Sequence, residues 1–192
     1  MADLVFRSTR MKVLPMILAS MTTLAVVSGC SSPSKSPLKR FDSLSIQGTP
    51  KFEAQVEKAL ALLKAQSPAG YATVTNYVGI VRENKHSGME VHHKPPVFLL
   101  NGNSAYYSIS WCAGVIAHDS FHSKLYFDYK KQHPEARWVP KTVDRGEEAE
   151  RACLQHQLAV LKDIAAPASE MDWCRQSVTN QYWLVKYRNR NW

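Results

Sequence analysis

The sequence is poor in the features that mark several special classes of protein. Its 192 residues include only 8 glycines and 10 prolines, which excludes a collagen-like or low-complexity chain. Hydrophobic residues make up 45% and charged residues 21%, so a wholly disordered chain and a multi-span membrane protein are also excluded. A P-loop, a GxGxxG motif, a CxxC motif, a Ser-His-Asp signature and internal repeats are all absent. What remains is the composition of one ordinary globular domain.

A candidate targeting segment occupies the first 29 residues. Arg7, Arg10 and Lys12 precede an uncharged run, VLPMILASMTTLAVV, at positions 13–27. A basic segment followed by an apolar run predicts a secretory signal, and this run is short for a membrane span. Met11 is an equally good start of translation.

The apolar run ends in Val27-Ser28-Gly29-Cys30, which resembles the bacterial lipobox. The resemblance implies cleavage of the signal peptide before Cys30 and acylation of Cys30, for example with palmitate. The domain would then lie outside the cytoplasm, anchored to a membrane of the bacterial cell envelope through two or more acyl chains. A plain signal with an incidental cysteine, or an apolar N-terminal helix, is the alternative.

Removal of residues 1–29 also changes the charge. The signal holds three of the 24 basic and one of the 16 acidic residues, so the net charge falls from +8 to +6. Residues 30–48 are rich in proline and serine at their start and predict a flexible tether, and residues 49–192 predict a single domain. The basic and aromatic tail 186–192 would suit nucleic acid, but an envelope lipoprotein rarely meets it, so no nucleic-acid partner is expected.

Three cysteines remain in the domain, namely Cys112, Cys153 and Cys174. In an oxidising compartment an odd number permits at most one internal disulfide and leaves one thiol. Cys153 and Cys174 lie closer to the C-terminus than Cys112, and they are the expected pair.

The pattern of the domain predicts an α+β fold, with a small antiparallel sheet packed against two or three helices. The clearest helix, 51–66, carries an apolar stripe at helical spacing. The stripe consists of Phe52, Val56, Ala59, Leu60 and Leu63. The other predicted elements are strands at 71–82 and 89–100, turns at 83–88 and 101–103, a helix capped by Ser108 or Ser110 that runs to about 132, a loop at 133–146, a helix at 147–165, and a mixed segment from 167 with a short helix and an extended tail.

The second predicted helix carries two histidines, His118 and His122, one turn apart and about 40° apart around the helix axis. Trp111 and Val115 lie on the same face, so both imidazoles should point toward the interior. Buried imidazoles need partners, and a shared metal ion would provide one for each. A pair of hydrogen-bonded core histidines is the alternative.

The segment His118-Asp119-Ser120-Phe121-His122 resembles the HExxH helix of gluzincin-like zinc metallopeptidases, with Asp119 in the place of the glutamate. The approach to this helix is similar too, because an apolar strand ending in PVFLL is followed by a polar turn and a serine-rich cap. The resemblance covers roughly residues 74–165. It implies a zincin-like fold, a Zn²⁺ cofactor bound by His118 and His122, and Asp119 as the general base that hydrolyses peptide bonds.

Gluzincins take their third zinc ligand, a glutamate, from the next long helix. On the predicted helix at 147–165, Glu150 lies inside the apolar arc, Glu147 lies at its margin and Glu148 faces water. An ionised glutamate in a buried stripe is costly unless it is paired or bound to a metal, so Glu150 is the expected ligand and Glu147 the reserve. The alternatives are an ion pair of Glu150 with Arg137 or Arg145, and His156 as a ligand.

Asp119 is one methylene shorter than glutamate, and an error of about 1 Å in position can reduce a rate about a hundredfold. The active-site helix can compensate by lying closer, or a second water molecule can relay the proton. In the third case the site binds zinc without hydrolysis. Tyr182 or another tyrosine of the C-terminal segment could stabilise the oxyanion, but the sequence does not select one.

Two function classes follow from these residues. The first is a lipid-anchored zinc metallopeptidase that binds a peptide or protein substrate along the edge of its sheet. The second is a non-catalytic envelope lipoprotein, either a binding module or an inactive zincin-like domain. His92 and His93, near the end of the predicted edge strand, would contact substrate or lie on a solvated face. The sequence does not determine the oligomeric state.

Overall fold

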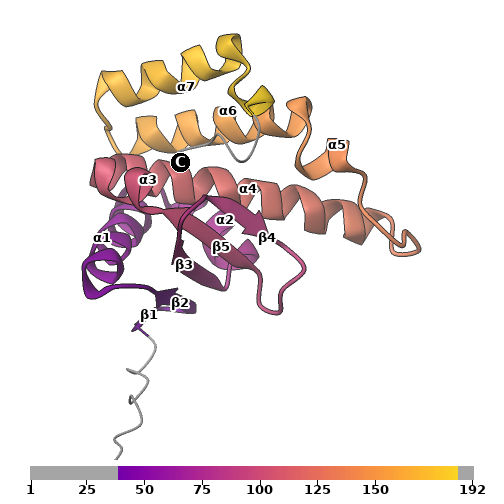
Figure 1. Ribbon diagram of the computed structural model, residues 1–192, viewed down its shortest axis with the longest axis horizontal. Helices are drawn as coiled ribbons and strands as arrows, with labels where there is room; N and C mark the ends of the chain where they lie inside the picture. Colours follow the sequence, from indigo (N-terminus) through magenta and orange to yellow (C-terminus); the bar gives the residue numbers. More distant parts are fainter. Residues whose placement is uncertain (1–38, 186–192) are drawn as a thin grey trace, which may run out of the picture. The chain divides into compact units, whose positions relative to one another are not determined.

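The computed structural model describes residues 39–185. The predicted signal 1–29, Cys30 and the tail 186–192 lie outside the described residues. Within residues 39–185 the chain forms an α+β domain with a five-stranded sheet packed against helices, which confirms the predicted fold class (Figure 1). In this part of the chain, no helix combines the length and the apolar character needed to cross a membrane.

The sheet has mixed strand directions. Its strands are β1 (Lys39–Phe41), β2 (Leu44–Gln47), β3 (Ile80–Asn84), β4 (Gly88–Glu90) and β5 (Val97–Asn101), in the spatial order β1-β2-β3-β5-β4. The central pairs β2–β3 and β3–β5 are parallel, whereas β1 and β4 pair antiparallel at the two edges. The prediction of an antiparallel sheet therefore holds only for the edges. Parallel pairing of β2 and β3 requires a long crossover, which α1 and α2 provide.

Strands β1 and β2 lie within the predicted tether 30–48. In β2, Leu44 and Ile46 are fully buried while Ser45 and Gln47 are partly exposed. This alternation is the period of a strand with one face on the core. The folded domain consequently begins before residue 49.

Helix α1 (Pro50–Gln66) confirms the helix predicted at 51–66, and the five residues of the predicted stripe are its buried residues. Thr49 caps the helix, because its Oγ1 accepts a hydrogen bond from the Phe52 amide at 3.3 Å. Pro50 takes the first helical position, where the missing N–H group costs no hydrogen bond.

Helix α2 (Pro68–Tyr77) differs from the strand predicted at 71–82, of which only the end forms β3. The β-branched residues of this segment favour a strand, but tertiary packing decides otherwise. Pro68 begins the helix, and Val74 is fully buried in the core. Gly70 allows a close approach to α6, since a Cβ atom there would lie 2.7 Å from Cγ2 of Val160.

The strand predicted at 89–100 is two antiparallel strands, β4 and β5, separated by residues 91–96. The predicted turn at 101–103 begins helix α3 (Gly102–Tyr107), which Asn101 caps through a 2.7 Å hydrogen bond from the Asn103 amide. The remaining helices are α4 (Ile109–Gln132), α5 (Lys141–Asp144), α6 (Glu147–Asp163), α7 (Ala168–Asn180) and the short 3₁₀ helix η1 (Tyr182–Leu184).

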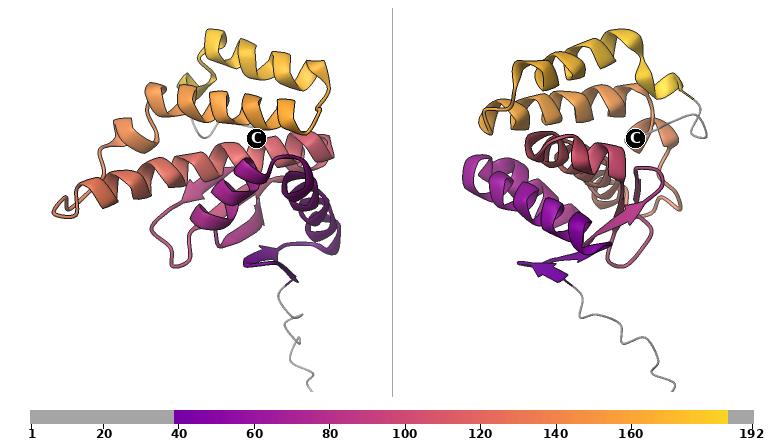
Figure 2. Two further views of the ribbon diagram at one scale, coloured as in Figure 1. Left: turned by 180° about the vertical axis from the view of Figure 1, so that it is seen from behind. Right: turned by 60° about the vertical axis from the view of Figure 1, so that its left-hand side comes forward.

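Helix α4 is the centre of the domain and was predicted correctly. Its cap is Ser108, whose Oγ accepts a hydrogen bond from the Trp111 amide at 2.8 Å. Figures 1 and 2 show α6 lying along α4, α7 covering α6, and the sheet on the other side of α4. Helices α1 and α2 also pack against α4.

A glycine on α4 sets the distance between α4 and α6. A Cβ atom on Gly114 would lie 2.8 Å from Cδ2 of Leu161 and 3.4 Å from Cγ of Gln157. The two helices therefore meet closely at this position. Their close approach brings the polar residues of α6 against His118 and His122 of α4.

Candidate metal centre

Helices α4 and α6 bring His118, His122 and Cys153 together in a buried cluster that can hold a metal ion. The potential ligand atoms of these three residues all lie within 4.8 Å of one another. Glu150 of α6 lies beside them and is itself buried, with 8% of its surface exposed. We refer to these four residues as the metal cluster.

Each histidine of the cluster is oriented by a hydrogen bond from its Nδ1 atom. His122 Nδ1 lies 2.6 Å from the carbonyl oxygen of Asp144, and His118 Nδ1 lies 3.1 Å from Oε1 of Gln157. Both partners are acceptors, so Nδ1 carries a proton on each ring, and in the neutral form of the ring Nε2 carries the lone pair that a metal ion needs. Metal-binding histidines commonly donate their second ring N–H to such a carbonyl oxygen.

The free atoms of the cluster form a small triangle. The two Nε2 atoms lie 3.2 Å apart, and Oε2 of Glu150 lies 3.4 Å from each of them. Ligands held about 2.0–2.2 Å from a tetrahedral metal ion such as Zn²⁺ are about 3.3–3.6 Å from one another. Two imidazole nitrogens and a carboxylate at these separations fit a metal ion between them.

The charges in the cluster support a bound cation. Burial would raise the pKa of the Glu150 carboxyl, but hydrogen bonds and charges from His118 and His122 outweigh it and lower that pKa. Burial would likewise lower the pKa of His122, yet Cys153 and Glu150 raise it well above its ordinary value. The site thus keeps a carboxylate ionised and attracts positive charge.

Tyr182, from η1, completes the polar network. Its hydroxyl donates a hydrogen bond to Oε2 of Glu150 and lies 3.2 Å from Nε2 of His118. Burial, followed by the negative charge of Glu150, raises the pKa of Tyr182 well above its ordinary value. The hydroxyl therefore stays protonated and can donate a hydrogen bond. Tyr182 is thus the described tyrosine of the C-terminal segment that contacts the metal cluster, whereas Tyr187 lies outside the described residues.

Cys153 has a different place from the one predicted. In the described residues Cys112, Cys153 and Cys174 are all free and buried, so the predicted Cys153–Cys174 disulfide is not formed. Cys153 instead lies beside His122 in the metal cluster. Cys153 follows Glu150 by three residues on α6, so the two side chains share one face of the helix. This spacing could have indicated that Cys153 lies near the histidines.

Gln157 and Asp144 were not identified from the sequence. Gln157 lies one turn after Cys153 on α6. Its Oε1 atom contacts His118, whereas its Nε2 atom is buried without a hydrogen-bond partner among the described residues. Asp144 belongs to α5, a helical turn inside the predicted loop 133–146. No local sequence pattern connects either residue to the histidines, which are 39 and 22 residues away.

The other candidates from the sequence lie outside the cluster. Glu147 and Glu148 are exposed, and Glu147 forms an ion pair with Arg151 at 2.8 Å. Arg145 pairs with Asp144 rather than with Glu150, and the exposed Arg137 forms no ion pair with Glu150 in the described part of the chain. These positions agree with the prediction, made from helical periodicity, that Glu150 is buried and Glu148 faces water.

The other histidines considered from the sequence also lie apart from the metal cluster. His156 stacks on Phe121 with 4.6 Å between ring centres, and burial lowers its pKa. His92 contacts Tyr126, and His93 lies 3.3 Å from Glu90. Both His92 and His93 are exposed, which fits a solvated face.

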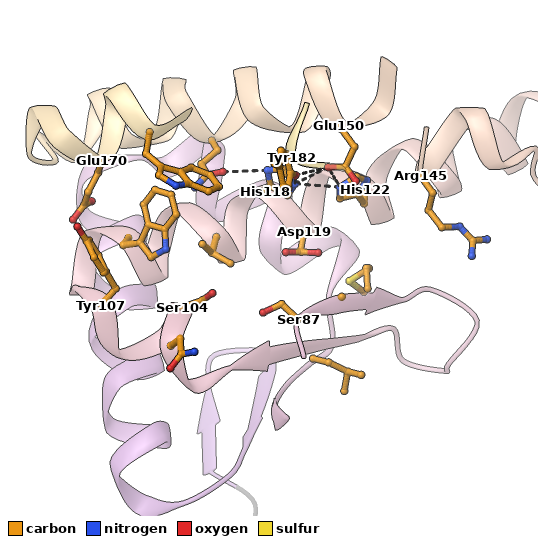
Figure 3. Close-up of a pocket in the computed structure, with 18 of the residues that line it drawn as sticks. Ser87, Ser104, Tyr107, His118, Asp119, His122, Arg145, Glu150, Glu170 and Tyr182 are labelled. Carbon is orange, nitrogen blue, oxygen red and sulfur yellow. Dashed lines mark hydrogen bonds and ion pairs between the residues drawn. The ribbon is translucent and has the colours of Figure 1, made fainter. Parts of the chain in front are cut away.

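Three residues of the metal cluster, His118, His122 and Glu150, lie in the wall of a cavity of about 700 Å³. Residues of β4 line the cavity opposite α4, and β4 is an edge strand of the sheet. Figure 3 shows the carboxylate of Asp119 inside the cavity, between the histidine pair and Ser87. Comparisons of the chain with protein-family models, with curated proteins and with solved structures found no match.

Proposed function

We propose that this protein is a zinc-dependent hydrolase of peptide bonds, of the gluzincin-like type, in which His118, His122 and Glu150 hold Zn²⁺. The triangle of Nε2, Nε2 and Oε2 atoms, with edges of 3.2–3.4 Å, is the observation that carries the proposal. A zinc ion bound there would act as a Lewis acid and lower the pKa of a water molecule.

Asp119 is the proposed general base. It follows His118 directly on α4 and lines the same cavity, so its carboxylate can take a proton from a water molecule and pass it to the leaving amine. The hydroxyl of Tyr182, protonated at neutral pH, donates a hydrogen bond to Glu150 in the structure and can turn it to negative charge that develops on the substrate oxygen once zinc is bound to Glu150.

Strand β4 offers a place for the substrate backbone. It pairs with β5 on one side only, and it forms the wall of the cavity that faces α4. An extended peptide can add to such an edge through main-chain hydrogen bonds. Peptides and unfolded segments of proteins are therefore the substrates that suit this cavity.

The N-terminal sequence supports a location for this activity. We extend the proposal to a lipoprotein anchored in the bacterial cell envelope through Cys30. Cys30→Ser should move the protein from the membrane fraction to the soluble fraction, or block its processing. Normal cleavage together with unchanged membrane fractionation would contradict the anchor and would leave the proposal for the domain untouched.

Zinc content and peptide hydrolysis, measured on the same preparations, test the domain function. The wild type should bind one zinc ion per chain and cleave a mixture of unstructured peptides. Asp119→Asn should keep the zinc, since a general base is not a metal ligand. The rate of hydrolysis should fall at least about a hundredfold, because the variant has no carboxylate to take the proton. Glu148→Gln, a change of an exposed carboxylate, should alter neither property. A folded wild type without zinc would contradict the proposal.

A non-catalytic zinc domain is the second candidate, and Cys153 is the reason. If its thiolate joined both histidines and Glu150, four protein ligands would surround the metal, as in closed structural zinc sites. Cys153→Ser separates the two. A catalytic site should keep zinc and hydrolysis in this variant, whereas a closed structural site should lose zinc affinity and thermal stability together.

A further inference from the structure

The end of the cavity away from the metal cluster is lined by aromatic rings. Tyr107 and Trp111 lie 5.9 Å apart between ring centres, and Trp111 and Trp173 lie 4.8 Å apart in an edge-to-face arrangement. Tyr107 is 69% exposed and Trp173 is 41% exposed, although both are large apolar side chains. Exposed aromatic rings grouped around a cavity commonly mark a binding site.

A buried carboxylate lies among these rings. Glu170 is only 3% exposed, and its Oε1 atom accepts a 2.6 Å hydrogen bond from the Ser108 hydroxyl. Its Oε2 atom is buried without any hydrogen-bond partner, and no lysine, arginine or histidine of the described chain forms an ion pair with it. Burial of a carboxylate without a counter-charge costs free energy, so a cation bound beside Glu170 would be stabilising.

The rings and the carboxylate converge because of their positions on three helices. Trp173 follows Glu170 by three residues and shares its face of α7. Tyr107 ends α3 just before Ser108, and Trp111 lies in the first turn of α4 just after it. Figure 3 shows Glu170 beside Tyr107 at one end of the cavity. We call Tyr107, Trp111, Trp173 and Glu170 the aromatic subsite.

The charge along the cavity also favours a cation at this end. Among the described residues that line it, five carry carboxylates and one is an arginine, although the whole chain has a net charge of +8. The carboxylates belong to Glu90, Asp119, Asp144, Glu150 and Glu170. Arg145 lies at the opposite end of the cavity from Glu170 (Figure 3). Its positive charge would repel a cation less at the aromatic subsite than near the metal cluster.

We propose that the aromatic subsite binds an organic cation, the ammonium of a lysine or the guanidinium of an arginine in a bound peptide. Aromatic faces attract such groups, and the buried carboxylate behind them adds charge complementarity. Trp111 precedes His118 by seven residues on one helix, which is about 10 Å along the axis. An extended peptide spans that distance with about three residues. The identification of the ligand as a substrate residue rests on the proposed function.

The test compares two probes that differ only in the terminal ammonium group of the side chain, namely N-acetyl-lysine methylamide and N-acetyl-norleucine methylamide. Binding to the full chain is followed by the NMR signals of the tryptophan indoles, with and without zinc. We expect the lysine probe to bind about tenfold more tightly than the norleucine probe. Equal binding of the two probes would overturn the proposal.

Two substitutions separate recognition from structure. Glu170→Gln keeps an acceptor for Ser108 but removes the charge, and it should reduce the preference for lysine to less than about twofold, whereas Glu147→Gln should leave it unchanged. Tyr107→Leu removes an exposed ring with little effect on the core, and it should weaken binding of the lysine probe about threefold. A Glu170→Gln variant that melts earlier yet keeps the full preference would show that Glu170 only joins α7 to α4 and would overturn the proposal.

The cation has a second potential source in the chain itself, because Lys186, Arg188 and Arg190 follow the described residues. Replacement of all three by glutamine in the full chain should leave the lysine preference intact if the ligand is external. A several-fold tighter binding of the probe in that variant would assign a competing ligand to the tail and would still support the subsite.

The binding test does not depend on catalysis. A lysine preference without peptide hydrolysis would retain the aromatic subsite and reject the proposed function. Hydrolysis without any preference between lysine and norleucine probes would reject the subsite and retain the function.

Discussion

The two ends of the cavity are built on opposite principles. At the metal cluster, the polar atoms of His118, His122 and Glu150 contact one another within 3.2–3.4 Å and are oriented from behind by Gln157 and the Asp144 carbonyl. At the aromatic subsite, one oxygen of Glu170 has no hydrogen-bond partner among the described residues, and two of the three rings, Tyr107 and Trp173, are exposed.

This difference indicates two kinds of ligand. A converging set of buried donors suits an ion that stays bound as part of the protein. A buried carboxylate behind exposed rings suits a group that arrives with a ligand and leaves with it. The two ends can therefore be changed separately, and binding of zinc and of the lysine probe can be measured on the same variants.

The largest effect is expected from loss of a histidine. His118→Ala and His122→Ala each remove one of the two nitrogen ligands, and each should weaken zinc binding by more than about a hundredfold. Titration of the metal-free protein with zinc in a competing chelator measures this. Binding of the lysine probe at the aromatic subsite should change by less than about twofold in both variants.

His92→Ala is the matched control, because it removes an exposed histidine outside the metal cluster. It should leave zinc affinity unchanged. Thermal melts of the metal-free variants are needed beside the titrations, since a histidine variant that does not fold would also lose zinc. Folded His118→Ala protein that binds zinc like the wild type would disprove the metal cluster.

The second prediction concerns the choice among three neighbouring glutamates. Glu150→Gln should weaken zinc binding by about ten- to a hundredfold, because an amide oxygen replaces a charged ligand. Glu147→Gln should have no effect, since Glu147 is exposed and pairs with Arg151. Retention of zinc in the first variant with loss in the second would contradict the assignment of Glu150.

The metal end was largely predictable because its signals are local. His118 and His122 share a helix face by their spacing alone, and the wheel of the next helix distinguished Glu150 from Glu148. Ser108 as the cap of α4 and the stripe of α1 followed from equally local patterns. Periodicity and capping act over a few residues, so one sequence suffices to recognise them.

The aromatic end was not predictable because it depends on contacts across the chain. Ser108 and Glu170 are 62 residues apart, and their hydrogen bond exists only after α7 has packed on α6. The strand predicted at 71–82 was wrong for a related reason: the packing of Val74 into the core and of Gly70 against Val160 selects the helix α2. The predicted Cys153–Cys174 disulfide was wrong because Cys153 lies beside His122, a contact between two helices that the sequence alone does not show.

The third prediction concerns Gln157, which does not bind the metal but hydrogen-bonds to the ligand His118. Gln157→Leu removes the acceptor of the His118 Nδ1 proton, so the ring loses the contact that fixes its orientation. Loss of such a supporting hydrogen bond commonly weakens metal binding about tenfold or more. Chelator competition measures the effect, and Gln155→Leu, a change at an exposed position of the same helix, is the control. Unchanged zinc affinity in Gln157→Leu would mean that helix packing alone holds His118 in place.

The smallest effect is expected from pH, and its sign follows from the charges in the metal cluster. The pKa of His122 is raised well above its ordinary value in the metal-free protein, against the effect of burial, by Cys153 and Glu150. Near neutral pH zinc must therefore displace a proton from this ring, whereas Glu150, whose pKa is lowered, needs to lose none. Zinc affinity should consequently fall as the pH falls by one unit from about 7.5 to about 6.5, by at most about tenfold for one displaced proton. Binding of the lysine probe should change less over this range, because the aromatic subsite contains no histidine. Calorimetry in buffers of different ionisation enthalpy would count the released protons, and zinc binding without proton release at neutral pH would contradict the raised pKa of His122.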